Sequence, residues 1–296
     1  MHILTEADVE FVGIQESQKI VKPSEFRDEI DDLFENGESM EGIKFPWRKT
    51  HNDFGMRKGE VTIWAGINGH GKSQILNQVC ASALVESKWL IASLEMPVKR
   101  TMQRMIKQIS GMGSPSKQYR HEILDYTDGK LWIYDQLDTV STTQILGMIE
   151  FAVKEYGIEF FILDSLIKCG TRPDDYSAQA AFVDKLTWSA RRNNIHIHLV
   201  HHIAKQADEE TMPNKMSVKG AGEITDLAEN VIVVHRNKRK ERMIREGKEP
   251  DSHHDTSISI LKQRHNGIES LNFLWFLPDS EQFVEADGLN PMMYKL

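Results

Sequence analysis

Cysteine is scarce in this chain of 296 residues, which contains only Cys80 and Cys169. Neither has a second cysteine at CxxC spacing, which argues against a disulfide framework and against a structural zinc site. Long apolar runs are also missing, since no segment approaches the roughly 18 apolar residues of a membrane span. The opening MHILTEADVEFVG lacks the basic and apolar regions of a secretory signal. We therefore expect a reduced compartment, cytoplasmic or nucleoid-associated, and no membrane partner.

An excess of positive charge is absent as well. The formal net charge of −8 argues against a broadly basic nucleic-acid surface. A local basic loop, or a positive pore shared by several copies, would not appear in this total, so composition neither supports nor excludes DNA. Internal repeats and low-complexity tracts are missing too. The length and ordinary composition predict one large α/β domain over residues 41–296, preceded by a short segment over residues 1–40.

Short β-rich runs alternate with helical stretches from residue 60 onward, which is typical of a mainly parallel sheet with crossover helices. The runs predict strands over 60–66, 88–95, 130–136, 158–164, 195–202 and 229–236, and helices over 73–86, 98–109, 142–156 and 178–193. Two later runs, 256–265 and 270–278, flank Asn266-Gly267 and predict a C-terminal β-hairpin.

Two further stretches allow two interpretations each. Phe26, Ile30, Leu33 and Phe34 share one face of a predicted short helix, which packs on its own domain or on a partner. The charged stretch 236–250 is a nucleic-acid arm or a solvated loop or helix. Its mixed signs favour the solvated interpretation.

The segment GINGHGKS follows a predicted strand, precedes a predicted helix and has the spacing of a phosphate-binding loop. Its backbone N–H groups and the positive end of the helix are suited to the α- and β-phosphates of a nucleotide. Lys72 is expected to reach the β- and γ-phosphates, and Ser73 to offer its hydroxyl to Mg²⁺. The predicted nucleotide-binding residues are Gly66, Asn68, Gly69, His70, Gly71, Lys72, Ser73 and Gln74.

Two carboxylates at predicted strand ends complete the expected site. Asp164 ends the apolar run FFILD and is predicted to bind Mg²⁺ with Ser73. The next residue is Ser165 rather than a glutamate, so the catalytic base must come from elsewhere. Glu95, in SLEMP at the end of another strand, is the predicted base, because ligands of parallel sheets bind at the carboxyl ends of the strands. The alternative is an ordinary helix-start glutamate.

Polar groups after the strand over 195–202 predict a sensor and a DNA contact. His201 and His202 are adjacent on a strand and point to opposite faces, so they make a poor joint metal site. A residue here can instead sense the γ-phosphate. The polar loop that follows is long enough to be functional, and its second half is predicted to contact DNA phosphates away from the acidic residues 208–210. The predicted DNA-binding residues are Lys205, Lys215, Lys219, Gly220 and Gly222.

A cationic pair lies next to the predicted hairpin turn. Lys262 and Arg264 are two residues apart on a strand and so share one face. If that face meets the γ-phosphate bound by another copy, Arg264 is an arginine finger acting in trans and Lys262 is its companion.

Together these motifs resemble the RecA-like core of hexameric replicative DNA helicases, the group that includes bacterial DnaB, the phage primase-helicases and mitochondrial Twinkle. The matching segments are GINGHGKS, SLEMP, FFILDS, LVHH, KGAGEI, AENVIVVHRN and ILKQRHNG, between about residues 55 and 285. The resemblance implies a ring oligomer that moves 5′-to-3′ on single-stranded DNA and hydrolyses ATP or dTTP with Mg²⁺ at subunit interfaces. Separate primase and DNA polymerase partners are expected.

The resemblance also implies individual roles. Glu95 corresponds to the base, His202 to the phosphate sensor, Lys262 and Arg264 to the trans-acting pair, and Arg236 to a residue that stacks on the nucleotide base. The helix around Phe26–Phe34 corresponds to the linker with which each copy docks on its neighbour. An aromatic partner for the base has three candidates, which core packing also explains: Trp275, Phe276 and Phe283. No zinc-binding or primase motif precedes residue 20, so priming activity is not implied.

Two alternatives remain from the residues. A recombinase binds DNA as a filament without processive unwinding, and a regulatory ATPase of the KaiC type uses nucleotide occupancy to control protein partners. The segments KQRHNG and KGAGEI favour the helicase.

Overall fold

The computed structural model describes residues 21–36, 42–170, 172, 175–203, 209–213 and 222–294. The chain divides into two compact units, Met1–Glu41 and Gly42–Leu296. In the first unit a 3-10 turn, η1 (Pro23–Phe26), leads into α2 (Arg27–Asn36), so the amphipathic pattern does form a helix. Phe26, Ile30 and Phe34 are exposed on it. The side chain of Leu33 lies outside the described residues.

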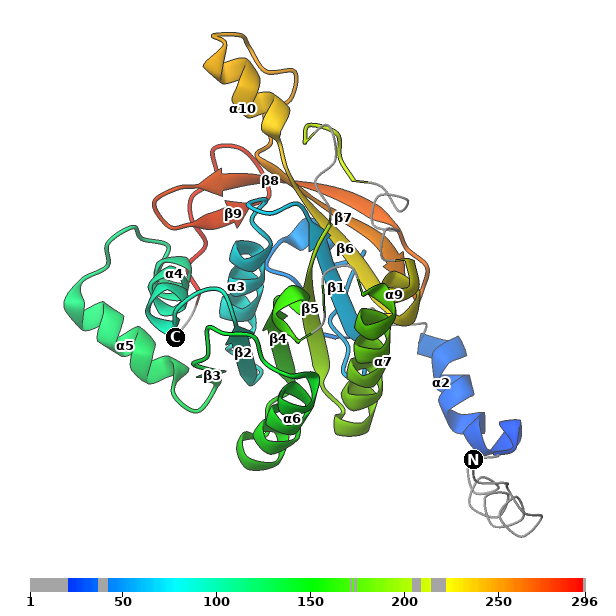
Figure 1. Ribbon diagram of the computed structural model, residues 1–296. Coiled ribbons are helices and arrows are strands. Elements are labelled where there is room, and N and C mark those ends of the chain that lie inside the picture. The colour runs from blue at the N-terminus through cyan, green and yellow to red at the C-terminus, as the bar shows by residue number, and fades with distance from the viewer. Residues whose placement is uncertain are drawn as a thin grey trace. The chain divides into compact units, whose positions relative to one another are not determined.

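In the described part of the second unit, nine strands form a sheet in the order β3-β2-β4-β5-β1-β6-β7-β8-β9 (Figure 1). The strands from β3 to β6 in this order are parallel, and β7, β8 and β9 are added antiparallel. The predicted parallel sheet with a C-terminal hairpin is confirmed. The strands are β1 (Val61–Gly66), β2 (Trp89–Ser93), β3 (Leu131–Ile133), β4 (Phe160–Asp164), β5 (His196–His202), β6 (Asn230–Arg236), β7 (Thr256–Gln263), β8 (Ser270–Leu277) and β9 (Gln282–Val284).

The four predicted helices are present within a few residues of their expected bounds. Sequence periodicity missed α5, because Ile123 and Thr127 are its only fully buried positions. The mixed-charge stretch after β6 forms α10, which projects beyond the sheet (Figure 1). The helices are α3 (Lys72–Ala83), α4 (Val98–Ser110), α5 (Lys117–Thr127), α6 (Thr142–Tyr156), α7 (Tyr176–Asn193), α9 (Gly222–Leu227) and α10 (Lys238–Arg245), with 3-10 turns η2 (Arg48–Thr50) and η3 (Leu166–Lys168).

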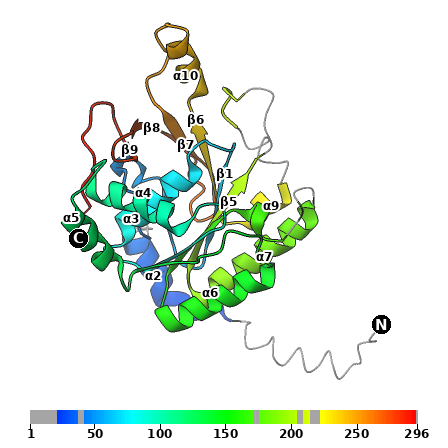
Figure 2. The ribbon, with the colours of Figure 1, turned by 60° about the vertical axis from the view of Figure 1, so that its left-hand side comes forward.

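Both faces of the sheet are covered, which explains why its strands are apolar throughout. Along β1, Ile63 and Ala65 pack in the cluster that contains residues of α6, α7 and α9, while Trp64 between them packs with α3, α4 and α5. Helices α6 and α7 lie beside each other on their face (Figure 2). The side chains packed on both faces of the sheet therefore fix the positions of the strand ends relative to one another.

The hairpin β7–β8 is wider than an Asn-Gly turn implies. The last paired residues are Ile260 and Ser270, so Asn266 and Gly267 belong to a longer connection in which Gly267 has a left-handed φ of 71°. β7 also ends at Gln263, and Arg264 lies just beyond it. Among the described residues, no helix is both long and apolar enough to cross a membrane.

Candidate nucleotide-binding and catalytic site

The predicted phosphate loop connects the end of β1 to the start of α3. At Gly66 a Cβ atom would lie 2.5 Å from the carbonyl oxygen of Val234, so the close approach of β6 requires glycine there. Gly69 and Gly71 have φ of 79° and 89°, in the left-handed region that other residues adopt only with strain. Gly71 is the N-cap of α3. The glycines thus turn the chain tightly onto a helix N-terminus, which suits the loop for an anion.

Lys72 lies folded onto this loop. Its ammonium donates to the carbonyl oxygens of Gly66 at 2.7 Å and Ile67 at 3.0 Å. Burial lowers the pKa of Lys72 to about 8, although the carboxylates of Asp164 and Glu95 oppose the change. A phosphate group in place of the two carbonyls would place negative charge directly opposite the buried ammonium and favour its charged form.

Ser73 and Asp164 meet where α3 begins and β4 ends. Asp164 is 6% exposed, and burial raises the pKa of its carboxyl group, while a hydrogen bond from Ser73 lowers it. A hydroxyl and a carboxylate are oxygen ligands of the kind that Mg²⁺ prefers, with phosphate and water oxygens filling its remaining positions. No larger cluster of metal-ligating side chains occurs in the described ranges. The pair therefore fits an ion that arrives with a phosphate.

Glu95 lies two residues beyond β2, beside this pair. β2 is hydrogen-bonded to β4 with Ser93 opposite Asp164, so the two strand ends are adjacent. The Glu95 carboxylate accepts a hydrogen bond from Ser165 Oγ at 2.6 Å and lies 3.5 Å from His202 Nε2. The side chain is 42% exposed. Glu95 is thus held in place and is open to solvent, as a base that activates water must be.

Ser165 is a site residue that sequence reasoning missed. The sequence draws attention to it only because it is not a glutamate, yet it is fully buried and donates to Glu95. Its position directly after Asp164 was the available signal. The serine therefore orients the neighbouring carboxylate.

His202 ends β5 opposite Gly66 of β1. Burial lowers the pKa of His202, and Lys72 adds to this, while Glu95 opposes it. Its Nδ1 atom is buried and has no hydrogen-bond partner among the described residues. His202 thus lies next to both the phosphate loop and Glu95, and its role as a phosphate sensor stays a prediction.

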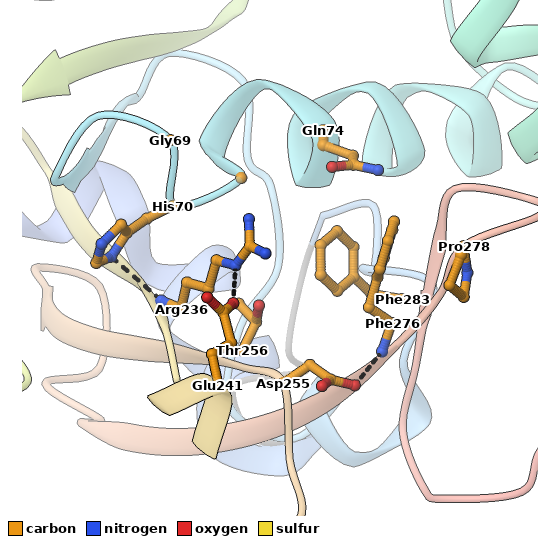
Figure 3. A pocket seen from close by; sticks show the side chains of 11 residues that line it. Gly69, His70, Gln74, Arg236, Glu241, Asp255, Thr256, Phe276, Pro278 and Phe283 are labelled. Atoms are coloured by element: carbon orange, nitrogen blue, oxygen red, sulfur yellow. Dashed lines mark hydrogen bonds and ion pairs between the residues drawn. The ribbon is translucent and has the colours of Figure 1, made fainter. Parts of the chain in front are cut away.

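A cavity of about 210 Å³ opens beside the phosphate loop (Figure 3). Gly69, Gly71 and Gln74 line it on one side, and Arg236 and Phe276 on the other. The Gln74 side chain donates a hydrogen bond to the backbone carbonyl of Glu281 at 3.3 Å. Arg236 is exposed. The cavity is suited to the base and sugar of a nucleotide whose phosphates lie on the loop.

Of the three aromatic candidates, two line this cavity. Phe276 and Phe283 lie with ring centroids 5.1 Å apart. Phe283 is buried, whereas Phe276 is half-buried. Trp275 is not among the lining residues and has the ammonium of Lys49 over its ring at 5.3 Å. Phe276 is therefore the best placed to contact a base.

Lys262 and Arg264 contact a different part of the molecule, the C-terminus of α9. Lys262 Nζ donates to the carbonyls of Thr225, Asp226 and Ala228 at 2.9, 2.9 and 2.8 Å. Arg264 Nη2 donates to the carbonyl of Asp226 at 2.9 Å. Arg264 lies beyond the end of β7 and not on the strand as predicted, yet both cations reach the carbonyl of Asp226 at the negative end of the helix.

The loop predicted to bind DNA is described only in part. Lys205, Lys215, Lys219 and Gly220 lie outside the described residues. Gly222 is the first residue of α9, so the prediction that it belongs to the loop was wrong; Ile224 of this helix packs in the core.

The short described segment 209–213 contacts β6 and α10. His235 Nε2 lies 3.1 Å from the carbonyl of Glu209, and Glu210 forms an ion pair with Arg242. Ion pairs also occupy Arg239 and Lys240 of α10, with Asp251 and Asp255 as partners. Much of the cationic charge of α10 is therefore neutralised within the chain, in keeping with a solvated helix.

Two solved structures share this architecture. The first, an ATPase domain, aligns with a TM-score of 0.74 and 16% identity over 90% of this chain and 100% of that chain. The second, "The Structure Of A DnaB-Like Replicative Helicase And Its Interactions With Primase", aligns with a TM-score of 0.72 and 15% identity over 90% of this chain and 68% of that chain. The fold is therefore that of a RecA-like ATPase domain.

Residues 50–285, most of the chain, match the DnaB-like helicase C terminal domain, and the chain belongs to this family. It is also similar to the Twinkle homolog protein, chloroplastic/mitochondrial, of Arabidopsis thaliana, with 22% identity over 235 residues that cover 72% of this chain. The match spans 33% of that relative. The predicted family is confirmed.

Proposed function

We propose that this chain contains the motor domain of a replicative DNA helicase, which hydrolyses ATP or dTTP and moves 5′-to-3′ on single-stranded DNA as a hexameric ring. One observation carries the proposal: Lys72, Ser73, Glu95, Asp164 and His202 converge at four adjacent strand ends in a chain of the DnaB-like family. Positioning and charge neutralisation are what phosphoryl transfer to water requires.

The phosphate loop binds the triphosphate through the backbone N–H groups of Gly66–Ser73. Lys72 exchanges the carbonyls of Gly66 and Ile67 for β- and γ-phosphate oxygens. Ser73 and Asp164 would hold Mg²⁺, and the ion would neutralise part of the phosphate charge. Arg236 and Phe276 contact the base in the adjoining cavity.

Glu95 accepts a proton from the water that attacks the γ-phosphorus. The hydrogen bond from Ser165 fixes one carboxylate oxygen, and the exposed side of the group faces solvent. His202, between Glu95 and the loop, hydrogen-bonds to the γ-phosphate and responds to its loss. Hydrolysis is thereby coupled to β5 and to the loop that follows it.

Lys262 and Arg264 act on the nucleotide of a neighbouring copy. Within one copy they hold the C-terminal carbonyls of α9, so their trans action requires an exchange of partners. α9 directly follows the loop that we assign to DNA. The exchange would move the helix next to that loop when the neighbouring nucleotide changes.

We assign DNA contact to the loop that carries Lys205, Lys215, Lys219 and Gly220 and leads into Gly222 at the start of α9. Six copies of this loop surround the strand. The exposed stripe of α2 docks on the adjacent copy. A primase and a DNA polymerase are the expected partners in the cytoplasm, and one of the similar solved structures concerns a helicase and its interactions with primase.

A strand-displacement assay on a forked duplex tests the function. We expect the protein to release the labelled strand with ATP or dTTP and Mg²⁺, and only from forks that carry a 5′ single-stranded tail. Glu95→Gln protein serves as the matched control, because it should bind nucleotide without hydrolysing it.

Two results would contradict the helicase proposal. DNA-stimulated hydrolysis without unwinding would favour the recombinase alternative. Hydrolysis that DNA does not stimulate would favour the regulatory ATPase. Particle mass measured with nucleotide and single-stranded DNA tests the ring separately.

A further inference from the structure

His70 occupies a variable position of the phosphate loop, yet its side chain is buried and is hydrogen-bonded to a strand that lies far away in the sequence. Pairing between β1 and β6 ends at Ala65 and Val233, because β1 there turns into the loop. Beyond that point the edge of β6 that faced β1 lies alongside the loop, while its other edge stays paired with β7. The carbonyl of Val234 lies against Gly66, and the N–H of Arg236 donates to His70 Nδ1 at 3.2 Å. The imidazole takes the place of a strand partner.

The environment of His70 preserves this acceptor. The side chain is 1% exposed, and its ring packs edge-on against His235 with centroids 5.3 Å apart. Burial lowers the pKa of His70 to about 4, and the charges of His235, Lys238, Lys72 and Arg236 add to the effect. The ring is therefore neutral near pH 7, and Nδ1 keeps its lone pair for the Arg236 N–H.

Arg236 is held at its other end as well. Its Nε donates to the carboxylate of Glu241 on α10, which also pairs with Lys238. Figure 3 shows the arginine between these two contacts at the edge of the cavity, with His70 on its backbone side and Glu241 on its side-chain side. The contact with His70 joins two segments 166 residues apart in the sequence.

We propose that His70 is a positioning residue that fixes the phosphate loop relative to Arg236, so that one nucleotide meets its phosphate contacts and its base contact together. The proposal rests on the proposed function in one respect, the assignment of the cavity to the base. Without the His70 contact, the end of β6 stays paired with β7 but loses its hydrogen bond to the phosphate loop. Phosphate binding on the loop itself is unaffected, because the backbone N–H groups and Lys72 supply it.

The test compares a ligand that has a base with one that lacks it. Equilibrium binding of ATP and of inorganic triphosphate is measured with Mg²⁺ for wild type, His70→Leu and His70→Asn. His70→Leu removes the acceptor, while His70→Asn keeps an acceptor oxygen near the position of Nδ1. We expect His70→Leu to weaken ATP binding about fivefold, the scale of one hydrogen bond, with triphosphate binding unchanged. His70→Asn should restore most of the ATP affinity.

A double-mutant cycle with Arg236→Ala tests whether His70 acts through the arginine. We expect His70→Leu to cause no further loss of ATP affinity in the Arg236→Ala protein. Steady-state hydrolysis should show a raised KM and an unchanged kcat for His70→Leu alone. Triphosphate binding also reports whether the loop is folded in each variant, and His70→Phe, which keeps a ring, replaces His70→Leu if the latter misfolds.

Three results would overturn the proposal. They are equal weakening of ATP and triphosphate binding, unchanged ATP affinity in the variants without an acceptor, and losses of ATP binding free energy that add up when His70→Leu is combined with Arg236→Ala. None of these measurements requires DNA. Failure to unwind a fork therefore leaves this test intact, and failure here leaves the helicase proposal standing.

Discussion

The parallel and antiparallel parts of the sheet differ in how they present their functional residues. At the ends of parallel strands β2 and β4, Glu95 and Asp164 lie next to each other and next to Lys72. On antiparallel β7 and just after it, Lys262 and Arg264 instead hold the carbonyls of α9. One copy thus brings together the residues proposed to bind phosphate and to activate water, while the two proposed trans-acting cations contact a helix end elsewhere. The difference is what a site divided between two copies would produce.

The largest effect is expected on the antiparallel side. Arg264→Ala should lower kcat for hydrolysis about a thousandfold, the scale of a lost arginine finger, because the charge that develops on the γ-phosphate loses its trans partner. Steady-state hydrolysis at saturating nucleotide measures the change. Binding of nucleotide to isolated copies should persist, since the phosphate loop is intact.

Mixing tests whether Arg264 acts in trans. Arg264→Ala copies mixed with wild-type copies should depress activity more steeply than their fraction in the mixture. A loss of activity that is linear with that fraction would contradict action in trans. The division of the site between the two parts of the sheet would then be wrong.

A smaller loss is expected on the parallel side. Glu95→Gln should lower hydrolysis at least about a hundredfold, the usual scale for a general base, because an amide accepts no proton from water at neutral pH. Nucleotide affinity should remain close to that of wild type. Single-turnover hydrolysis and equilibrium binding measure the two quantities, and full turnover in this variant would remove Glu95 from the role of base.

The parallel part of the site could largely be predicted from the sequence. Asp164 ends a continuous apolar run, Glu95 closely follows another mostly apolar run, and the ends of parallel strands meet at one edge of a sheet. The contacts of the other residues depend on distant segments. The hydrogen bond between Ser165 and Glu95 requires the pairing of β2 with β4, and His70 reaches Arg236 only because β1 stops pairing with β6. No local pattern encodes such contacts.

Three structural features show the same limit. α5 buries few side chains, so its periodicity is weak. β9 is three residues long and is held by pairing with β8, a contact that sequence reading could not foresee. The contacts of Lys262 with α9 likewise join segments 34 to 37 residues apart, and a cationic pair on a strand does not by itself indicate a helix end as its partner.

Ser165→Ala sharpens the comparison within the parallel site. We expect kcat to fall about tenfold with KM unchanged, because Glu95 loses the hydrogen bond that orients it and keeps its charge. In a Glu95→Gln background the same substitution should have little further effect. A rise in KM without a change in kcat would instead assign Ser165 to nucleotide binding.

The last effect concerns stability rather than catalysis and lies in the same parallel half. His196 on β5 is fully buried, and its ring nitrogens contact Thr62 Oγ1 at 2.9 Å and the carbonyl of Arg57 at 2.6 Å. Burial lowers the pKa of His196 from 6.5 to about 4, so between these values the unfolded chain binds a proton that the native state does not. The free energy of unfolding therefore falls as pH drops from about 6.5 toward 4, by up to about 1.4 kcal/mol per pH unit for this residue.

Replacing this buried histidine with a group that does not titrate tests the assignment. His196→Gln keeps a donor and an acceptor, so its free energy of unfolding should depend less steeply on pH than that of wild type, with a difference of about 3 kcal/mol accumulated by pH 4. Urea unfolding at a series of pH values measures both slopes. His121→Gln, at an exposed position of α5, is the matched control for the change of histidine to glutamine. Equal pH slopes of the free energy of unfolding for wild type and His196→Gln would contradict this assignment. The loss of stability in acid would then arise from other groups.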